Sequence, residues 1–296
     1  MMREEAAWLD SAFLHRLDKL SITSKKMIQG SLMGKRKSKQ IGTSNEFSDY
    51  RSYTPGDDLR HLDWNAYARI GKLFLKTFLD EQQWPISIYI DCSRSMNYGD
   101  PSKFQRALQL TAALGYITLS HFDRLSVYAF DREIVSALPA TAGKGKVHAL
   151  FRFLQSVDIG SEGDLNSALK ARSSQVSQAG ISIIISDFLF EKGYEEGIRF
   201  LQATKQEVTL IQLLSREERN PFYQGDIQFI DSETKQVKDV TVTPPLLKSY
   251  LGAVKDYQDQ LRAFARSRGI SYLEVHAEES LEDIVFQLFK KSGLIR

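Results

Sequence analysis

Short apolar runs alternate with amphipathic stretches along the chain from residue 86 onward. The runs predict β-strands at 86–91, 124–130, 181–188, 207–214 and 271–276. Apolar residues at helical spacing predict helices at 101–121, 147–157, 164–176, 193–204, 244–268 and 281–289. The strands are apolar on both faces, as in parallel sheets that helices cover on both sides. The pattern therefore predicts an α/β fold with a doubly wound, mostly parallel sheet.

Two local signals refine this prediction. Asp100 is the expected N-cap of the helix at 101–121, with Pro101 in its first position, because both residue types favour these places. Residues 226–242 alternate between apolar and polar on both sides of a polar turn, which predicts a β-hairpin.

The first 84 residues follow a different pattern. A short amphipathic helix near the N-terminus is predicted by Leu9, Phe13, Leu17 and Leu20. A basic loop that contains several glycines follows, and residues 46–84 predict a small, mostly β subdomain with a strand at 73–79. We therefore divide the chain into residues 1–84, which hold the helix, the basic loop and this subdomain, and residues 85–296, the α/β domain.

Composition and charge narrow the class of protein. The formal net charge is +2 at pH 7, so no overall attraction to nucleic acid or to a membrane surface is expected. Cys92 is the one cysteine, which excludes an intrachain disulfide and fits a reducing compartment. No run reaches the roughly 18 consecutive apolar residues of a membrane-spanning helix. A signal peptide is not expected either, because Glu4, Glu5 and Asp10 stand where it would need an uninterrupted apolar segment. We expect a cytoplasmic protein without a membrane span.

Oxygen-bearing side chains follow two of the predicted strands. Asp91, Ser93 and Ser95 stand at every second position from the end of the first strand, and Asp187 lies at the end of a later one. Because ligands of doubly wound sheets bind at the carboxyl ends of the strands, these side chains are expected to share one site if the strands are neighbours. Carboxylate and other oxygen ligands are those that Mg²⁺ prefers. The sequence therefore predicts a magnesium or manganese site.

Two motifs resemble those of known families. The stretch IYIDCSRSM resembles the first loop of a von Willebrand factor A-like domain, a Rossmann-like fold whose metal-ion-dependent adhesion site uses D-x-S-x-S. Asp187, in IISDF, matches the third-loop aspartate of that site. The stretch NEFSDYRSYTPGDDLRHLDWNAYARIGKLFLKTFLDE resembles the hallmark segment of a bacterial domain-of-unknown-function family, number fifty-eight in its series, which pairs this segment with such a domain. The resemblance covers roughly residues 25–290.

The resemblance implies a non-enzymatic, protein-binding adaptor. Members of this family are commonly encoded beside MoxR-type AAA+ ATPases and are thought to act with them in chaperone-like maturation or remodelling of protein complexes. A MoxR-type AAA+ ATPase and a client protein complex are therefore the expected partners. The metal ion of the adhesion-type site would complete its shell with a carboxylate from a partner.

One position departs from the adhesion-site pattern. The resemblance requires a threonine in a second loop, but Gly163 stands there, in SEGDLNSAL, and Asp164 follows it. Asp164 is either a replacement oxygen ligand or the N-cap of the next helix. Because a hydroxyl ligand is missing, we expect the metal site to be weak or vestigial.

Two other functions stay open on the sequence alone. Asp91 could be the nucleophile of a Mg²⁺-dependent phosphatase, although Ser93 stands where such enzymes have a second acid. The basic loop could bind the phosphates of nucleic acid, or it could be a solvated linker, since no aromatic residue lies among its charges. Its basic residues are Lys25, Lys26, Lys35, Arg36, Lys37 and Lys39.

Charged and aromatic residues alternate within the hallmark segment. They form either a docking surface for a partner protein or an internal ion-pair network that fixes the β subdomain to the α/β domain. The residues are Arg51, Asp57, Asp58, Arg60, Asp63, Trp64 and Arg69.

Overall fold

The computed structural model describes residues 9–23, 47–54, 59, 62–78, 83–170, 179–221, 225–230 and 237–296. The chain divides into two compact units. One unit comprises residues 1–22 and 84–296, and the other comprises residues 23–83. The expected boundary after residue 84 lies beside this junction, whereas the N-terminal helix belongs to the α/β unit and not to the smaller one.

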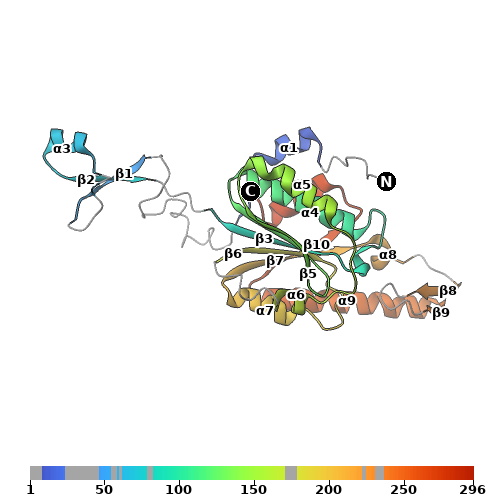
Figure 1. Ribbon diagram of the computed structural model, residues 1–296. Coiled ribbons are helices and arrows are strands. Elements are labelled where there is room, and N and C mark those ends of the chain that lie inside the picture. The colour runs from blue at the N-terminus through green and yellow to red at the C-terminus, as the bar shows by residue number, and fades with distance from the viewer. Residues whose placement is uncertain are drawn as a thin grey trace. The chain divides into compact units, whose positions relative to one another are not determined.

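Among the described residues, six strands form the central sheet of the α/β unit (Figure 1). They are β3 (Pro85–Asp91), β4 (Arg124–Phe130), β5 (Ile134–Thr141), β6 (Gly180–Ser186), β7 (Gln206–Leu214) and β10 (Ser271–His276). Their spatial order is β5-β4-β3-β6-β7-β10, and every neighbouring pair is parallel except β4 with β5. The strand order therefore reverses between β3 and β6, the place where doubly wound sheets bind ligands. The predicted mostly parallel α/β sheet is confirmed.

Helices cover both faces of the sheet (Figure 1). The face with the N-terminal helix carries α1 (Ser11–Leu17), α4 (Lys103–Ser120), α5 (Val147–Ser156) and the C-terminal elements α10 (Leu281–Asp283), η4 (Ile284–Phe289) and α11 (Lys290–Ser292). The opposite face carries α6 (Leu165–Lys170), α7 (Glu195–Ala203) and α9 (Pro244–Ser267). Short elements occupy the connections, namely η2 (Arg94–Met96), η3 (Lys144–Lys146) and α8 (Arg216–Arg219).

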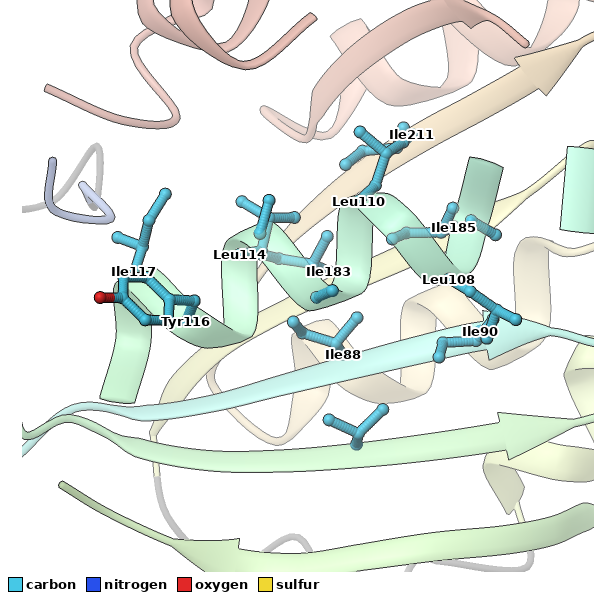
Figure 2. Close-up of a cluster of buried hydrophobic side chains, with 14 of the residues drawn as sticks. Ile88, Ile90, Leu108, Leu110, Leu114, Tyr116, Ile117, Ile183, Ile185 and Ile211 are labelled. Carbon is cyan, nitrogen blue, oxygen red and sulfur yellow. The ribbon is translucent and has the colours of Figure 1, made fainter. Parts of the chain in front are cut away.

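Successive residues of the central strands enter two separate cores. Ile88 and Ile90 of β3 belong to the same buried cluster as Leu110 and Leu114 of α4 (Figure 2). Tyr89, which lies between them, packs in the core on the other face of the sheet. Because a strand that is covered on both faces has few positions that face solvent, these segments form mostly apolar runs in the sequence.

Helix α4 begins two residues later than the sequence predicts. Its N-cap is Ser102, whose hydroxyl oxygen accepts a hydrogen bond from the Gln105 amide N–H at 3.2 Å. Asp100 and Pro101 precede the helix, so Asp100 is not its cap. Serine and aspartate are comparable N-caps, and the pattern alone does not choose between two candidates this close together.

The sequence patterns do not predict strand β5. Its side chains alternate between half-buried and exposed, and it contains Pro139. Both features suit a strand at the edge of a sheet, which leaves one row of backbone groups unpaired. The predicted hairpin is present as β8 (Gly225–Ile230) and β9 (Val237–Val242).

The smaller unit contains an antiparallel pair of strands, β1 (Phe47–Ser52) and β2 (Phe74–Phe78). The strand predicted at 73–79 is thus confirmed as β2. Helix α3 (Trp64–Ile70) lies between the two strands in the sequence and was not predicted. Its N-cap is Asp63, and Gly71 ends it in the left-handed conformation. The basic loop lies outside the described residues.

Candidate functional site

The carboxyl ends of β3 and β6 bring two aspartates to the same edge of the sheet. Asp91 is the last residue of β3, and Asp187 directly follows β6. The two strands are parallel, hydrogen-bonded neighbours at the point where the strand order reverses. Both side chains are fully buried. The structure therefore places Asp91 and Asp187 together, as their positions in the sequence predict.

Both carboxylate oxygens of Asp91 are engaged by the protein itself. Oδ1 accepts a hydrogen bond from the Ser93 amide N–H at 2.8 Å, and Oδ2 accepts one from the Ser186 hydroxyl at 2.6 Å. The hydroxyls of Ser93 and Ser95 lie 3.1 Å apart and hydrogen-bond to each other. Burial, together with the charge of Asp187, raises the pKa of Asp91 to about 7, although the hydrogen bonds from Ser186 and Ser93 act in the opposite direction.

The second aspartate contacts a buried lysine that the sequence patterns do not single out. Lys103 Nζ donates to Asp187 Oδ2 at 2.7 Å and also to Glu218 Oε1. Asp187 Oδ1 accepts a hydrogen bond from the Leu189 amide N–H at 3.0 Å. We refer to Asp91, Lys103, Asp187 and Glu218 as the strand-end cluster.

The position of Lys103 in the sequence contains a signal for its burial. It stands four residues before Ala107 and seven before Leu110, in phase with the buried face of α4. A lysine on the apolar face of a helix needs a buried counter-charge, since an unpaired charge is rarely buried. The position of Glu218 is also marked in the sequence, because Ser215 and Glu218 have the spacing of a capping box, which predicts the start of α8.

The second loop adjoins Ser93, but no hydroxyl stands at position 163, where the threonine is expected. A Cβ atom on Gly163 would lie 3.2 Å from Ser93 Cβ and only 2.7 Å from the Phe190 ring atom Cε1. The place of the expected threonine is therefore filled by Phe190, a buried side chain.

Asp164 has the structural role that the sequence left open. Its Oδ1 accepts a hydrogen bond from the Ser167 amide N–H at 3.0 Å, which caps the start of α6. Its Oδ2 lies 2.8 Å from Lys192 Nζ and 2.9 Å from the Ser167 hydroxyl. Burial acts to raise the pKa of Asp164, but these contacts, among which the hydrogen bond from Lys192 is the largest, together hold the pKa below its ordinary value.

The side chains in these loops do not fit the divalent cation that the adhesion-site resemblance implies. Each carboxylate oxygen of Asp91 and Asp187 already accepts a hydrogen bond from the protein. The threonine is absent, and Phe190 fills its place. An ammonium group stands beside Asp187, and it would repel a cation that shared this carboxylate. No group of three or more His, Cys, Asp or Glu side chains in the described ranges is arranged to hold a metal ion.

Comparison with known proteins places the chain in a family. The model of one family, described as "Protein of unknown function DUF58", matches residues 49–260. The chain belongs to DUF58. An uncharacterised protein of Mycobacterium tuberculosis is 25% identical over 272 residues, which cover 90% of this chain and 86% of that protein. An uncharacterised protein of Mycobacterium avium is 24% identical over 155 residues, which cover 51% of this chain and 91% of that protein.

Solved structures resemble this DUF58 chain only weakly. An aerotolerance-related membrane protein from Bacteroides fragilis gives a TM-score of 0.45 at 15% identity, covering 70% of this chain and 99% of that one. BatB from Bacteroides thetaiotaomicron gives a TM-score of 0.44 at 17% identity, covering 71% and 98%. These TM-scores are too low to support an inference about fold or function. In the described part of this DUF58 protein, no helix is long and apolar enough to cross a membrane.

Most of the hallmark segment lies within the DUF58 match, and the segment contributes an exposed helix. Asp63 is buried and caps α3 by accepting hydrogen bonds from two amide N–H groups, at 2.9 and 3.0 Å, and it also accepts one from the Tyr50 hydroxyl. Trp64 is 62% exposed, and Arg51 and Arg69 are exposed as well. The other three residues of the predicted docking set, Asp57, Asp58 and Arg60, lie outside the described residues.

Cys92 is expected to be unreactive while the protein is folded. Its side chain is fully buried, and its thiol donates to the Phe130 carbonyl oxygen. Burial, followed by the charges of Asp91 and Asp131, raises the pKa of the Cys92 thiol to about 12. Since the thiolate is the reactive form, iodoacetamide at about pH 8 should leave the native protein unmodified but label the protein in denaturant completely. Mass spectrometry measures both, and rapid labelling of the native protein would show that the carboxyl end of β3 opens readily.

Proposed function

We propose that this DUF58 protein is a non-enzymatic adaptor that binds other proteins in the cytoplasm. Its proposed partners are a MoxR-type AAA+ ATPase and a client protein complex that the ATPase matures or remodels in a chaperone-like way. The ATPase and the client complex are proposed as partners because the family resemblance implies them. The observation that carries the binding role is the exposed apolar face of helix α3.

Helix α3 has no buried residue, yet it carries three large apolar side chains. Trp64, Tyr67 and Ile70 are spaced by three residues and therefore share one face of the helix; they are 62%, 45% and 62% exposed. The rings of Trp64 and Tyr67 pack edge to face at 6.4 Å. Exposed apolar side chains gathered on one face mark protein interaction sites, and tryptophan and tyrosine are over-represented among the residues that dominate binding energy.

The contacts of the strand-end cluster do not favour the phosphatase alternative. A phosphatase reaction through Asp91 would require this carboxylate to reach a substrate, but it is fully buried and both oxygens accept hydrogen bonds from serines. The adaptor could also bind its partner through Mg²⁺ or Mn²⁺ held by Asp91, Ser93, Ser95 and Asp187, and this stays a prediction. The hydrogen bonds that these residues make within the protein do not favour it.

The adaptor proposal predicts that Trp64→Ala weakens capture of an AAA+ ATPase from native lysate. The bait proteins are the wild type, Trp64→Ala and Phe122→Ala, and bound proteins are quantified by mass spectrometry. Phe122 is a matched control because it is 59% exposed and lies in the α/β unit, before the amino end of β4. Removal of a central aromatic side chain should reduce the ATPase signal by at least about tenfold, whereas Phe122→Ala should leave it unchanged.

Two outcomes would count against the proposal. If wild type and both variants capture the ATPase equally, α3 is not the contact. If the wild type captures no ATPase, the adaptor role loses its support. Asp91→Ala is a poorer variant for this purpose, since Asp91 is fully buried and its loss changes the folded core as well.

A further inference from the structure

The Lys103 ammonium group is a cation built into the carboxyl-terminal edge of the sheet. Lys103 is the first residue of α4, and its side chain is fully buried. Its Nζ atom pairs with Asp187, which follows β6, and with Glu218, in the helix that follows β7. A single positive charge therefore connects three segments that are far apart in the sequence.

This lysine stands where neither burial nor helix position favours a positive charge. Burial penalises the charged form, and the amino end of a helix repels cations because of the helix dipole. Although burial alone would lower the pKa of Lys103, the charges of Asp187 and Glu218 raise it above its ordinary value. The carboxylates of Asp187 and Glu218, both within salt-bridge distance of Nζ, explain the position of this side chain.

The ammonium group pairs with an oxygen of Asp187, one of the residues that the adhesion-type pattern assigns to the metal ion. The adhesion-type pattern requires an ion held by Asp91, by the two serines, by Asp187 and by a threonine. In this chain Asp187 Oδ2 is 2.7 Å from Lys103 Nζ, and the threonine is replaced by Gly163 with Phe190 packed against it. Glycine at position 163 thus removes the threonine ligand, and the side chain of Lys103 supplies a positive charge beside Asp187.

We propose that Lys103 is the resident cation of this site, so that the strand-end cluster is complete without a divalent metal ion. Surfaces next to the cluster then keep their shape whether Mg²⁺ is present or absent. The inference goes beyond the adaptor role, because it concerns the isolated chain and holds for any partner.

The proposal predicts that removing the ammonium group creates a metal site. Lys103→Ala leaves Asp187 and Glu218 without their shared counter-charge and opens space between their oxygens, which are ligands that Mg²⁺ and Mn²⁺ prefer. Thermal unfolding of tag-free protein is measured in EDTA and in roughly 5 mM MnCl₂. Binding of Mn²⁺ to the native proteins is measured separately by electron paramagnetic resonance.

We expect no Mn²⁺ binding and no change in Tm for the wild type. Lys103→Ala should unfold at a lower temperature in EDTA and recover by about 3 °C or more in MnCl₂. Lys144→Ala is the matched control, because Lys144 pairs with Asp18 but is 53% exposed and lies away from the cluster in sequence and fold. It should behave as the wild type does in both media.

Two results would overturn the proposal. The first is saturable binding of one Mn²⁺ ion to the wild type at submillimolar concentration that Asp187→Asn abolishes. The second is a folded Lys103→Ala variant that gains no response to Mn²⁺. If Lys103→Ala does not fold, the titration of the wild type decides. Absence of an ATPase partner would leave these measurements untouched, since they need only the purified chain.

Discussion

Replacing Lys103 with methionine is expected to lower the free energy of unfolding by about 3–5 kcal/mol. Methionine fills nearly the same volume, so the change removes the charge without creating a large cavity. Asp187, whose side chain is fully buried, would lose its counter-charge, and so would Glu218, whose side chain is 16% exposed. An uncompensated buried charge costs far more than the loss of an exposed ion pair.

Urea unfolding followed by circular dichroism measures the difference, and Lys170→Met is the control. Lys170 pairs with Glu196, and both side chains are more than half exposed. Such pairs contribute little, so this variant should lie within about 0.5 kcal/mol of the wild type. Lys103→Met combined with Asp187→Asn should recover part of the loss, because one buried charge is then removed. If the free energy of unfolding of Lys103→Met is less than about 1 kcal/mol below that of the wild type, the stability of the cluster does not depend on its ammonium group.

The sequence predicts the sheet well because its strands are buried on both faces. A mostly apolar run such as 181–188 indicates a central strand whatever its neighbours are. Two aspartates at the ends of such runs are then brought to one edge by the parallel arrangement alone. Asp91 and Asp187 therefore follow from local pattern and topology.

The contacts of the cluster cannot be derived in the same way. Lys103 pairs with residues 84 and 115 positions further along the chain, and no local pattern connects them. Its phase on the buried face of α4 indicates only that it needs a counter-charge. Likewise, Gly163 is visible as a departure from a motif, whereas the ring of Phe190 that fills its place is visible only in the folded chain.

Elements at the periphery are harder to predict for a related reason. Strand β5 alternates between half-buried and exposed positions, and helix α3 has no buried residue at all. Neither has the apolar pattern on which sequence-based assignment depends. The exposed face of α3, on which the proposed binding role rests, therefore has no buried pattern from which it could be predicted.

Restoring the missing threonine is expected to destabilise the protein rather than to repair a metal site. Gly163 does not adopt the left-handed backbone conformation, so its conformation alone does not require glycine. The new side chain would collide with the Phe190 ring, 2.7 Å from the added Cβ atom, and would lie tightly against Ser93 Cβ, at 3.2 Å. Overpacking of this kind costs about 1–3 kcal/mol. Gly145→Thr is the control, because nothing lies within 4 Å of a Cβ atom there, and it should change stability by less than about 0.5 kcal/mol.

A double-mutant cycle with Phe190→Ala assigns the cost to the ring. Phe190→Ala alone should destabilise by about 3–5 kcal/mol, and adding Gly163→Thr to it should cost less than Gly163→Thr costs in the wild type, by about 0.5–3 kcal/mol. Urea unfolding of the four proteins gives this coupling. If Gly163→Thr alone is as stable as the wild type and binds Mn²⁺, the second loop can admit a ligand beside Ser93. In that case the ammonium group of Lys103 would not exclude a divalent ion, and the cluster would be a metal site that lacks one hydroxyl.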